Sequence, residues 1–484
     1  MGKTLTALFA HVLLIAMIIS GVGLLSSLAN DDNVTKEKFT GELERDVVIR
    51  VLENDTAKEQ GYLDVVLKAF NEQYKEYGIQ AVDANMGEYT DLELQGPYGY
   101  GPDIVFQAND VIMKYVDGRH VLPLPTKMLE CYSYVNKKAW NAYSEVVDGT
   151  NYTFGVPINI QQPLLYYRED MLPKNWKEEW DDDKNGIPDM IENWTDLYRY
   201  SKMIKEESNG KKYGYMKSLN DGYFASGYYI SYGGYVFGGE DGKDVFDIGF
   251  SKGESYKGGA IIRQLASVMN LECTEDTITK NAYSKIATGT YFATMTTPDV
   301  LGLFRKELAL EYQKQGYSSI DAMNMAIENI KTVDVPKLPV SGNLEDESQG
   351  MIDTTVMGGV NGYAISSYTK APNACLAFIN FASSFQMVEK RNELLGISPA
   401  RIDVSKKLGG LSEIVNENLE VGSIYIMPSK RELAQVWTPL QTFCATLADD
   451  VLKKKNKYTT RDAIHEGLLN VDKQIYDAIH TLAG

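Results

Sequence analysis

The stretch GPDIVFQAND, residues 101–110, decides the fold class predicted for this chain. A Gly-Pro turn leads into a short apolar run, Asp103–Gln107, which predicts a buried strand with polar residues at its end. Upstream, VVIRVL at residues 47–52 predicts another strand. Between the two, a helix is indicated by apolar residues on one stripe: Leu63, Val66, Leu67, Phe70 and Tyr74. Strand, helix and strand in this order predict an α/β fold with a mostly parallel sheet.

Polar residues stand where these two strands are expected to end. In parallel sheets, ligands bind beyond the carboxyl ends of the strands. Four residues occupy such positions and are candidate ligand-binding residues: Asn54, Asp55, Gln107 and Asp110. Asp110 has a second interpretation, as a cap for the helix predicted by VIMKYVDG. Its place at the end of a strand favours a ligand contact.

The composition narrows the class of partner. The chain has 484 residues, a formal charge of −18, 44% hydrophobic and 24% charged residues, as expected for a globular protein of two or three domains. It lacks the basic stripe that neutralises phosphates, so nucleic-acid binding is not expected. Only 4 histidines are present, which argues against a dedicated transition-metal site. The 32 tyrosines suit surfaces that bind amphipathic ligands such as sugars, although the core accounts for most of them.

The N-terminal residues predict export. Residues 1–29 contain Lys3, then an apolar run from Val12 to Leu25, then Ser27-Leu28-Ala29, which is the order of a secretory signal. The run is nearly long enough to span a bilayer, so a retained membrane anchor is the alternative. Residues 30–45 are polar and predict a flexible tether.

The four cysteines are widely spaced and lack metal-binding spacing. An exported protein could pair some of them, but small buried apolar residues are the favoured interpretation. They are Cys131, Cys273, Cys375 and Cys444.

Residues 181–192 read DDDKNGIPDMIE and fit the pattern of a calcium-binding loop. Calcium takes six to eight oxygen ligands, so a short loop must turn sharply, here at Gly186, and present alternate residues. Pro188 departs from paired helix-loop-helix sites, so a single structural site away from the solute is expected. The alternative is an acidic, solvated turn. The predicted Ca²⁺ ligands are Asp181, Asp183, Asn185, the Ile187 carbonyl, Asp189 and Glu192.

Five motifs in a fixed order resemble a known family. They are GPDIVFQAND (101–110), VPINIQQPLLYYREDMLP (156–173), SLNDGYF with YGGYVF (218–237), GISPAR (396–401) and AQVWTPLQTF (434–443). Each is weak alone. Together, from about Asp46 to the end, the chain resembles extracellular solute-binding proteins of bacterial ABC importers, the family that includes maltose- and maltodextrin-binding proteins.

The resemblance implies a periplasmic-binding-protein-like type II fold, with two α/β lobes, a ligand cleft between them and hinge crossovers near 157–159 and 358–365. The lobes of such proteins close on the solute, and the permease recognises the closed conformation. The implied protein is a monomer that delivers an oligosaccharide or other polar solute without chemistry, at the outer face of the membrane or in the periplasm. The implied lobes are 46–158 with 364–410, and 159–363 with 411–484.

The resemblance also assigns roles to particular residues. Asp110 and Asp221 are implied to accept hydrogen bonds from sugar hydroxyls, and Tyr223 and Trp437 to stack on the sugar. Tyr223 and Trp437 have an alternative as core residues. Arg401 is expected either to reach the cleft or, by preference, to lie on the surface.

Other positions depart from the pattern of the family. Gln107 replaces an aromatic platform, Gln161, followed by Gln162, replaces an acid, and Asp299 replaces a tryptophan. These departures favour a solute other than maltodextrin. The rival function is an exported glycoside hydrolase that uses Asp110 and Asp221 as paired carboxylates.

Overall fold

The computed structural model describes residues 38–85, 91–147, 149–239, 242–275 and 277–483. The expected signal or anchor, residues 1–29, lies outside the described residues, as does the first half of the expected tether. The chain forms two compact units. Unit 1 contains the described residues up to Ile160 together with Val360–Asn416, and unit 2 contains Gln161–Gly359 and Glu417–Gly484. The chain therefore passes between the units three times.

Unit 1 is an α/β unit. Its strands are β1 (Val48–Leu52), β2 (Gln80–Asp83), β3 (Ile104–Ala108), β4 (Ser144–Val147), β5 (Thr150–Thr153), β6 (Val156–Gln161) and β15 (Val356–Ile365), the last two of which continue into unit 2. Its helices are α3 (Asp55–Glu59), α4 (Tyr62–Gln73), α5 (Leu92–Gln95), α6 (Asn109–Asp117), α7 (Lys137–Asn141), α16 (Pro372–Ala382), α17 (Phe385–Leu395), α18 (Ile402–Leu408) and the first part of α19 (Gly410–Val421).

The sheet of unit 1 confirms the predicted strand–helix–strand order. Its strands follow the order β15-β3-β1-β2, and β6 also pairs with β15. β1 is parallel to both neighbours, with Val51 opposite Asp83 and Ile104. β15 is antiparallel to β3, with Asn361 opposite Ala108. The carboxyl ends of β1 and β3 therefore lie at one edge of the sheet.

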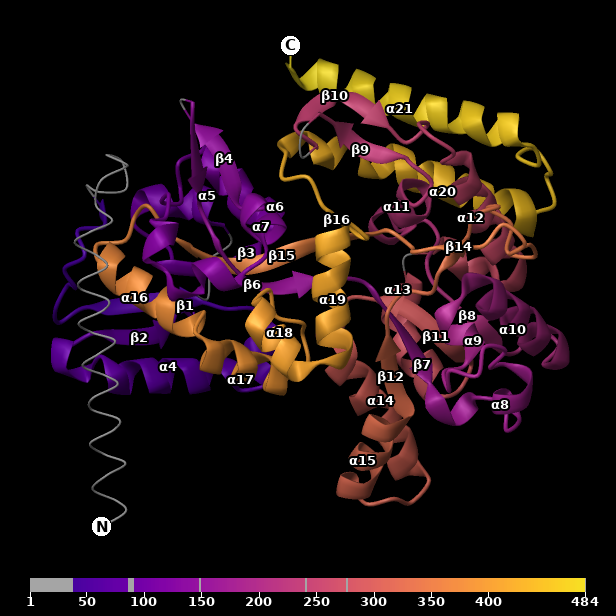
Figure 1. Cartoon of the computed structure of the whole chain (residues 1–484), viewed down its shortest axis with the longest axis horizontal. Helices are drawn as coiled ribbons and strands as arrows, with labels where there is room; N and C mark the ends of the chain where they lie inside the picture. Colours follow the sequence, from indigo (N-terminus) through magenta and orange to yellow (C-terminus); the bar gives the residue numbers. More distant parts are fainter. Residues whose placement is uncertain (1–37, 86–90, 148, 240–241, 276, 484) are drawn as a thin grey trace. The chain divides into compact units, whose positions relative to one another are not determined.

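Helix α4 covers this sheet as its apolar stripe predicts. Leu63, Val66, Leu67 and Phe70 are buried, whereas Tyr74, the last residue of the stripe, is half-buried just beyond the helix. In Figure 1, α4 runs close to α16 and α17. The Phe70 ring lies 5.1 Å from the ring of Phe378 on α16.

Residues 38–45, which we expected to belong to a flexible tether, pack onto unit 1. Phe39 is buried. The Glu44 carboxylate accepts hydrogen bonds from the backbone N–H groups of Asn373 at 3.1 Å and Ala374 at 2.7 Å. These donors belong to the first turn of α16, where orphan N–H groups favour a negative charge.

Unit 2 is also an α/β unit. Its strands are β7 (Leu164–Arg168), β8 (Tyr213–Tyr215), β9 (Tyr235–Gly238), β10 (Asp244–Gly249), β11 (Tyr291–Thr296), β12 (Ile330–Val333), β13 (Leu338–Pro339), β14 (Met351–Ile352) and β16 (Ile424–Ile426). Its helices are α8 (Trp176–Glu179), α9 (Asp189–Glu192), α10 (Trp194–Glu207), α11 (Gly222–Ile230), α12 (Tyr256–Val268), α13 (Thr277–Ala287), α14 (Leu301–Lys314), α15 (Ser319–Asn329), α20 (Trp437–Leu452) and α21 (Arg461–Ala483).

A four-stranded sheet, β12-β7-β11-β8, forms the centre of unit 2. β8 and β11 are parallel, with Ala293 opposite Tyr215. β7 runs antiparallel to β11 and to β12, so that Leu164, its first residue, pairs with Thr296, the last residue of β11. The ends of β8, β11 and β12 and the start of β7 therefore share one edge.

The C-terminal helix α21 runs beside α20 and β10 (Figure 1) and buries an apolar stripe, namely Ile464, Leu468, Val471, Ile475 and Ile479.

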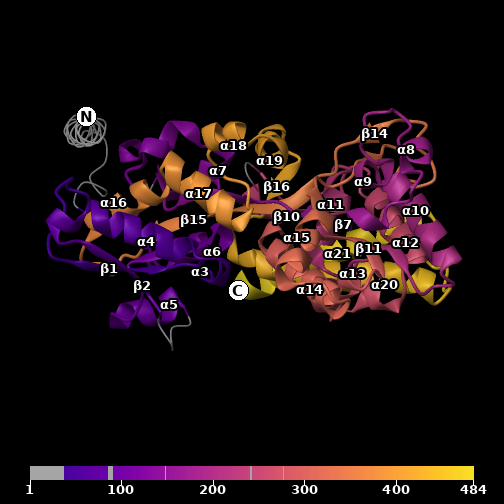
Figure 2. The ribbon, with the colours of Figure 1, turned by 90° about the horizontal axis from the view of Figure 1, so that it is seen from below.

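The helices α14 and α15 lie side by side in Figures 1 and 2. The chain turns between them at Gly316, whose φ is +99°.

The sequence left two points open, namely whether a helix spans the membrane and whether the cysteines form disulfides. Within the described ranges, no helix combines the length and apolar character needed to cross a membrane. All four cysteines are buried free thiols, which confirms the favoured interpretation. Burial raises the pKa of the Cys131 thiol to about 11 and that of Cys273 and Cys444 to about 12.

Candidate functional site

The carboxyl edge of the unit 1 sheet gathers the four polar residues expected there. Asn54 follows β1 and caps α3, because its side-chain oxygen accepts from the Ala57 N–H at 2.8 Å. Asp55 is exposed in the first turn of α3, and Gln107 is half-buried near the end of β3. Asn54 is therefore partly committed to local structure, whereas Asp55 presents its carboxylate to solvent.

Asp110 has the most unusual environment at this edge. It lies in the first turn of α6, but the helix begins at Asn109 after Ala108, and no side chain caps it. The Oδ1 atom of Asp110 is buried and has no hydrogen-bond partner among the described residues. Burial raises the pKa of this carboxyl group. A buried acceptor without a donor costs free energy, so it marks a position where a ligand can supply the missing donor.

The corresponding edge of unit 2 holds two groups of hydrogen-bonded polar side chains. Gln161 donates from Nε2 to Oδ1 of Asp299 at 3.1 Å. The buried Gln162 donates to Asp334, and Asn418 donates to Oε1 of Gln162 at 3.2 Å and to Oδ2 of Asp334 at 2.8 Å. The sequence analysis missed Asp334 and Asn418. The antiparallel pairing of β12 with β7 brings Asp334 close to Gln162, and Asn418 comes from α19, far along the chain.

Trp437 packs beside the loop that follows β8. Asp221 caps α11, and its carboxylate accepts from the Tyr223 N–H at 3.2 Å. Gly222 separates these two residues, and a Cβ atom placed there would lie 3.1 Å from Cε3 of Trp437. The absence of a side chain at Gly222 thus lets the half-buried indole approach the backbone. The structure brings Asp221, Tyr223 and Trp437 into one neighbourhood.

Lys217 lies in the same loop, and the sequence analysis did not single it out. The residue is 4% exposed, and its Nζ atom lies 3.4 Å from the centroid of the Phe224 ring. Burial lowers the pKa of Lys217 to about 8, although the Asp221 carboxylate acts in the opposite direction. The sequence feature that could have identified Lys217 is its position as a charged residue two positions after β8.

The loop predicted to bind calcium brings its acidic side chains together. One ligand atom from each of Asp183, Asp189 and Glu192 lies within 4.8 Å of the others. Gly186 has a φ of +83°, as the predicted sharp turn requires, and its N–H points to the Asp181 carboxylate at 3.2 Å. The donor set consists of hard oxygens, which fit Ca²⁺.

The amide of Asn185 lies among these carboxylates. Its Nδ2 atom donates to both oxygens of Glu192 at 3.1 Å and to Oδ2 of Asp183 at 3.2 Å. A cation held by the same carboxylates would require the amide to turn its oxygen inward. The Ile187 side chain is exposed, and its backbone carbonyl is the remaining predicted ligand.

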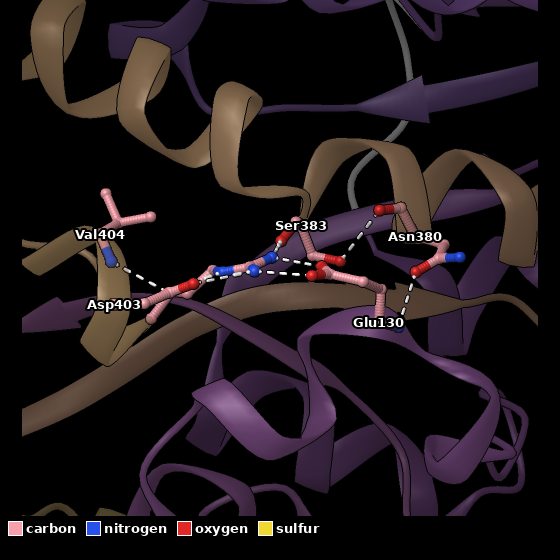
Figure 3. Close-up of polar contacts among 6 residues, drawn as sticks. Glu130, Asn380, Ser383, Asp403 and Val404 are labelled. Atoms are coloured by element: carbon pink, nitrogen blue, oxygen red, sulfur yellow. Dashed lines mark hydrogen bonds and ion pairs between the residues drawn. The ribbon is translucent and has the colours of Figure 1, made fainter. Parts of the chain in front are cut away.

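Arg401, for which a surface position was favoured, is buried in unit 1, so that expectation is wrong. It donates from Nη2 to Oε1 of Glu130 at 2.8 Å, from Nε to Oδ1 of Asp403 at 2.8 Å and from Nη1 to the carbonyl oxygen of Ser383 at 2.9 Å. Figure 3 shows Glu130, Ser383 and Asp403 converging on this guanidinium. The Nε, Nη1 and Nη2 groups of Arg401 all donate to acceptors within unit 1, so Arg401 has a structural role.

Comparisons with known proteins agree with this architecture. The model of the family described as bacterial extracellular solute-binding protein matches residues 54–386. The chain is 24% identical to the maltodextrin-binding protein MdxE of Bacillus subtilis, over 86% of this chain and 88% of the relative. It is 22% identical to a galactooligosaccharide-binding protein of the same organism, over 82% and 84%.

A solved structure, the maltose-binding periplasmic protein MalE from Listeria monocytogenes in complex with maltose, superposes with a TM-score of 0.67 at 19% identity, over 90% of this chain and 98% of that one. At this identity the likeness shows the fold, and it confirms the expected periplasmic-binding-protein-like type II class. The family match covers well over half of the chain. The chain therefore belongs to the family of bacterial extracellular solute-binding proteins.

Proposed function

We propose that this protein is the extracellular substrate-binding component of an ABC-type importer, and that its solute is an oligosaccharide. The observation that carries the proposal is the buried Oδ1 of Asp110, which has no partner among the described residues and lies at the carboxyl edge of the unit 1 sheet. A sugar hydroxyl is a neutral donor of the right kind for such an acceptor. Bound sugar would remove the free-energy cost of the unsatisfied oxygen.

The aromatic neighbourhood in unit 2 supports a sugar as the ligand class. A pyranose ring has an apolar face that stacks on an indole or phenol ring, while its hydroxyls reach polar groups around it. Trp437, Tyr223 and Asp221 supply both kinds of surface. The names of the two relatives, which bind maltodextrin and galactooligosaccharide, point to the same class.

We further propose that the protein performs no chemistry on its solute. A glycoside hydrolase needs two carboxyl groups flanking the scissile bond, one of which acts as an acid. Asp221, the proposed partner of Asp110 in such a mechanism, already caps α11 through the Tyr223 N–H. An oligosaccharide incubated with the protein should therefore be recovered unchanged, and the release of shorter products would favour the hydrolase.

The remaining parts of the proposal concern location and assembly. Residues 1–29 would direct export and either be removed or remain as an anchor, and the mature protein would act as a monomer. It would work at the outer face of the membrane or in the periplasm, where it would deliver solute to the permease subunits. The solute is expected to differ from maltodextrin because Gln107, Gln161 and Asp299 replace residues of the maltodextrin-binding pattern.

The test is a thermal-shift and calorimetric screen against oligosaccharides of defined composition. A ligand that binds only the native state raises its melting temperature. Asp110→Ala should weaken binding at least tenfold, whereas Asp64→Ala, which removes an exposed carboxylate from α4, should leave affinity unchanged. Trp437→Ala should also weaken binding, and Trp437→Phe should retain part of it. Unchanged affinity in both the Asp110→Ala and Trp437→Ala variants would refute the assignment.

We also propose that the 181–192 loop binds a structural Ca²⁺ ion. The support is the coincidence of the sequence register with the clustered side chains of Asp183, Asp189 and Glu192 and the left-handed Gly186. Asp181, Asn185 and the Ile187 carbonyl would complete the oxygen ligands. The ion would join the loop to α9, which supplies Asp189 and Glu192.

Removal of calcium tests this second proposal. Chelation should lower the melting temperature, and added Ca²⁺ should restore it, because an ion bound only to the native state stabilises it. Glu192→Gln should abolish the response to calcium, and Glu178→Gln on the nearby helix α8 should preserve it. A native protein without bound calcium in elemental analysis, whose melting temperature is insensitive to chelator, would exclude the site.

A further inference from the structure

Lys217 lies at the edge of the unit 2 sheet where ligands of α/β proteins bind. It follows β8 by two residues, and β8 is parallel to β11, whose last residue is Thr296. The loops beyond the carboxyl ends of adjacent parallel strands form the usual ligand position. Gln161 and Asp299 lie at the same edge, so Lys217 belongs to the region in which the proposed function places the solute.

Lys217 contributes to the wall of a small cavity at this edge. The free volume inside is about 10 Å³, which accommodates roughly one water-sized group. The polar lining residues are Lys217, Tyr283, Thr294 and Thr296, and the others are Met216, Ala282, Met295 and Phe304. The lining therefore includes one basic residue and three hydroxyl-bearing residues, within a mostly apolar surface.

The Lys217 residue is buried, and no described residue supplies an acceptor for its ammonium group. The residue is 4% exposed, and no described residue forms a hydrogen bond or an ion pair with Nζ. Its contacts are the face of Phe224 and a longer-range attraction to Asp221. A largely desolvated ammonium that meets no protein acceptor is expensive, since buried charges are normally paired. Cation–π attraction to Phe224 offsets only part of the cost.

A second cation near this edge, Arg305, also has a donor atom without an acceptor among the described residues. Arg305, which adjoins Phe304 of the cavity wall, has a buried Nε with no partner among the described residues. Its charge acts on Tyr166, whose hydroxyl donates to the Thr297 carbonyl at 2.9 Å. A carboxylate at this edge, Asp299, is hydrogen-bonded to Gln161.

We propose that Lys217 forms an anion subsite, so that the solute of this protein is an oligosaccharide bearing a carboxylate, as in a uronic acid. One carboxylate oxygen would fill the cavity and accept from Nζ, and Thr294 and Thr296 are lining residues of the same cavity. The proposal rests on the proposed function, because it identifies the chemical class of the same solute. A neutral sugar would leave the ammonium unsatisfied.

The experiment compares matched ligands by calorimetry on the whole protein. The probes are galacturonic acid oligomers and neutral galactose oligomers of equal length, together with sodium chloride and sodium acetate as sources of free anions. The variants are Lys217→Met and the control Lys202→Met, which removes a lysine with a 53% exposed side chain on α10. Circular dichroism establishes that each variant is folded, and Lys217→Gln replaces Lys217→Met if the latter is not.

We expect the acidic oligomer to bind at least tenfold more tightly than the neutral one, and Lys217→Met to remove that preference while Lys202→Met preserves it. Equal affinity for the acidic oligomer in the native and Lys217→Met proteins would overturn the subsite. Tighter binding of the neutral oligomer would overturn it while leaving the proposed function intact. Binding of chloride or acetate without any oligomer would assign the cavity to a free anion, and that result would also overturn it. If a broad oligosaccharide screen also gives no binding, the proposed function itself fails.

Discussion

Arg391 in unit 1 and Lys217 in unit 2 are both buried cations, with exposures of 0% and 4%. Arg391 donates from Nη1 to Oε1 of Glu53 at 2.6 Å and from Nε to Oδ1 of Asn159 at 2.7 Å. Its guanidinium also lies 4.1 Å from the centroid of the Phe106 ring. Lys217 lies over the face of the Phe224 ring but has no acceptor among the described residues.

The electrostatic consequences of these environments are opposite. Burial lowers the pKa of both side chains, but at Arg391 the Glu53 carboxylate outweighs it and the pKa rises. At Lys217 burial prevails and the pKa falls to about 8. A paired buried charge holds distant segments of the chain together, whereas an unpaired one destabilises the free protein. The difference suggests that Arg391 serves the fold and that Lys217 serves a ligand.

Removal of the paired cation should have the largest effect. Arg391→Met leaves the Glu53 carboxylate buried without its ion-pair partner, and we expect a loss of about 3–5 kcal/mol in the free energy of unfolding. Urea denaturation measures it. The double variant Glu53→Gln/Arg391→Met should recover part of the loss, because it removes the orphaned charge. If Arg391→Met were as stable as the native protein, the proposed difference between Arg391 and Lys217 would be wrong.

Removal of Lys217 should have the opposite effect on the free energy of unfolding. Lys217→Met replaces a buried ammonium with an apolar side chain of similar length, so we expect the free energy of unfolding at pH 7 to increase by about 2–3 kcal/mol. The control Lys202→Met should change it by less than about 0.5 kcal/mol. A loss of stability in Lys217→Met would mean that the ammonium has a structural partner.

The pH dependence of stability sharpens the same contrast. Below pH 8, Lys217 is protonated in both the folded and the unfolded chain. Between about pH 8 and the ordinary lysine pKa of 10.5, the unfolded chain keeps the proton that the folded chain has released. The contribution of Lys217 to the free energy of unfolding therefore rises with pH across this window. The stability difference between Lys217→Met and the native protein should shrink by roughly 1–2 kcal/mol between pH 7 and pH 9.5. A constant difference would show that Lys217 is not desolvated.

Arg401 provides an intermediate case with the smallest expected effect. Its guanidinium is buried, but its partner Glu130 has a 52% exposed side chain. Arg401→Lys keeps the charge and loses the forked contacts to Glu130 and Asp403, so we expect a destabilisation of ~1 kcal/mol. Thermal and urea unfolding measure the change. If Arg401→Lys lost as much stability as Arg391→Met, the solvent exposure of Glu130 would not explain the size of the effect.

Much of the fold could be predicted because local patterns determine it. The period of apolar residues in α4 and α21 places their buried faces, since side chains three and four positions apart share one side of a helix. The polar residues after β1 and β3 could be assigned to one sheet edge because parallel strands end together. The loop at residues 181–192 could be singled out as a candidate calcium site because its proposed ligands lie within twelve consecutive residues.

The partners of the buried charges could not be predicted in this way. Glu53 and Arg391 are 338 residues apart, and Glu130 and Arg401 are 271 residues apart. No local period in the sequence distinguishes Arg391 and Arg401, which have acceptors, from Lys217, which has none in the described part of the chain. Burial and pairing depend on which distant segments the sheets and helices bring together. The sequence alone therefore determined the elements, the family resemblance and the strand-end positions of the polar residues, whereas only the tertiary structure decided which charges are satisfied, because a charge is neutralised by what surrounds it in space.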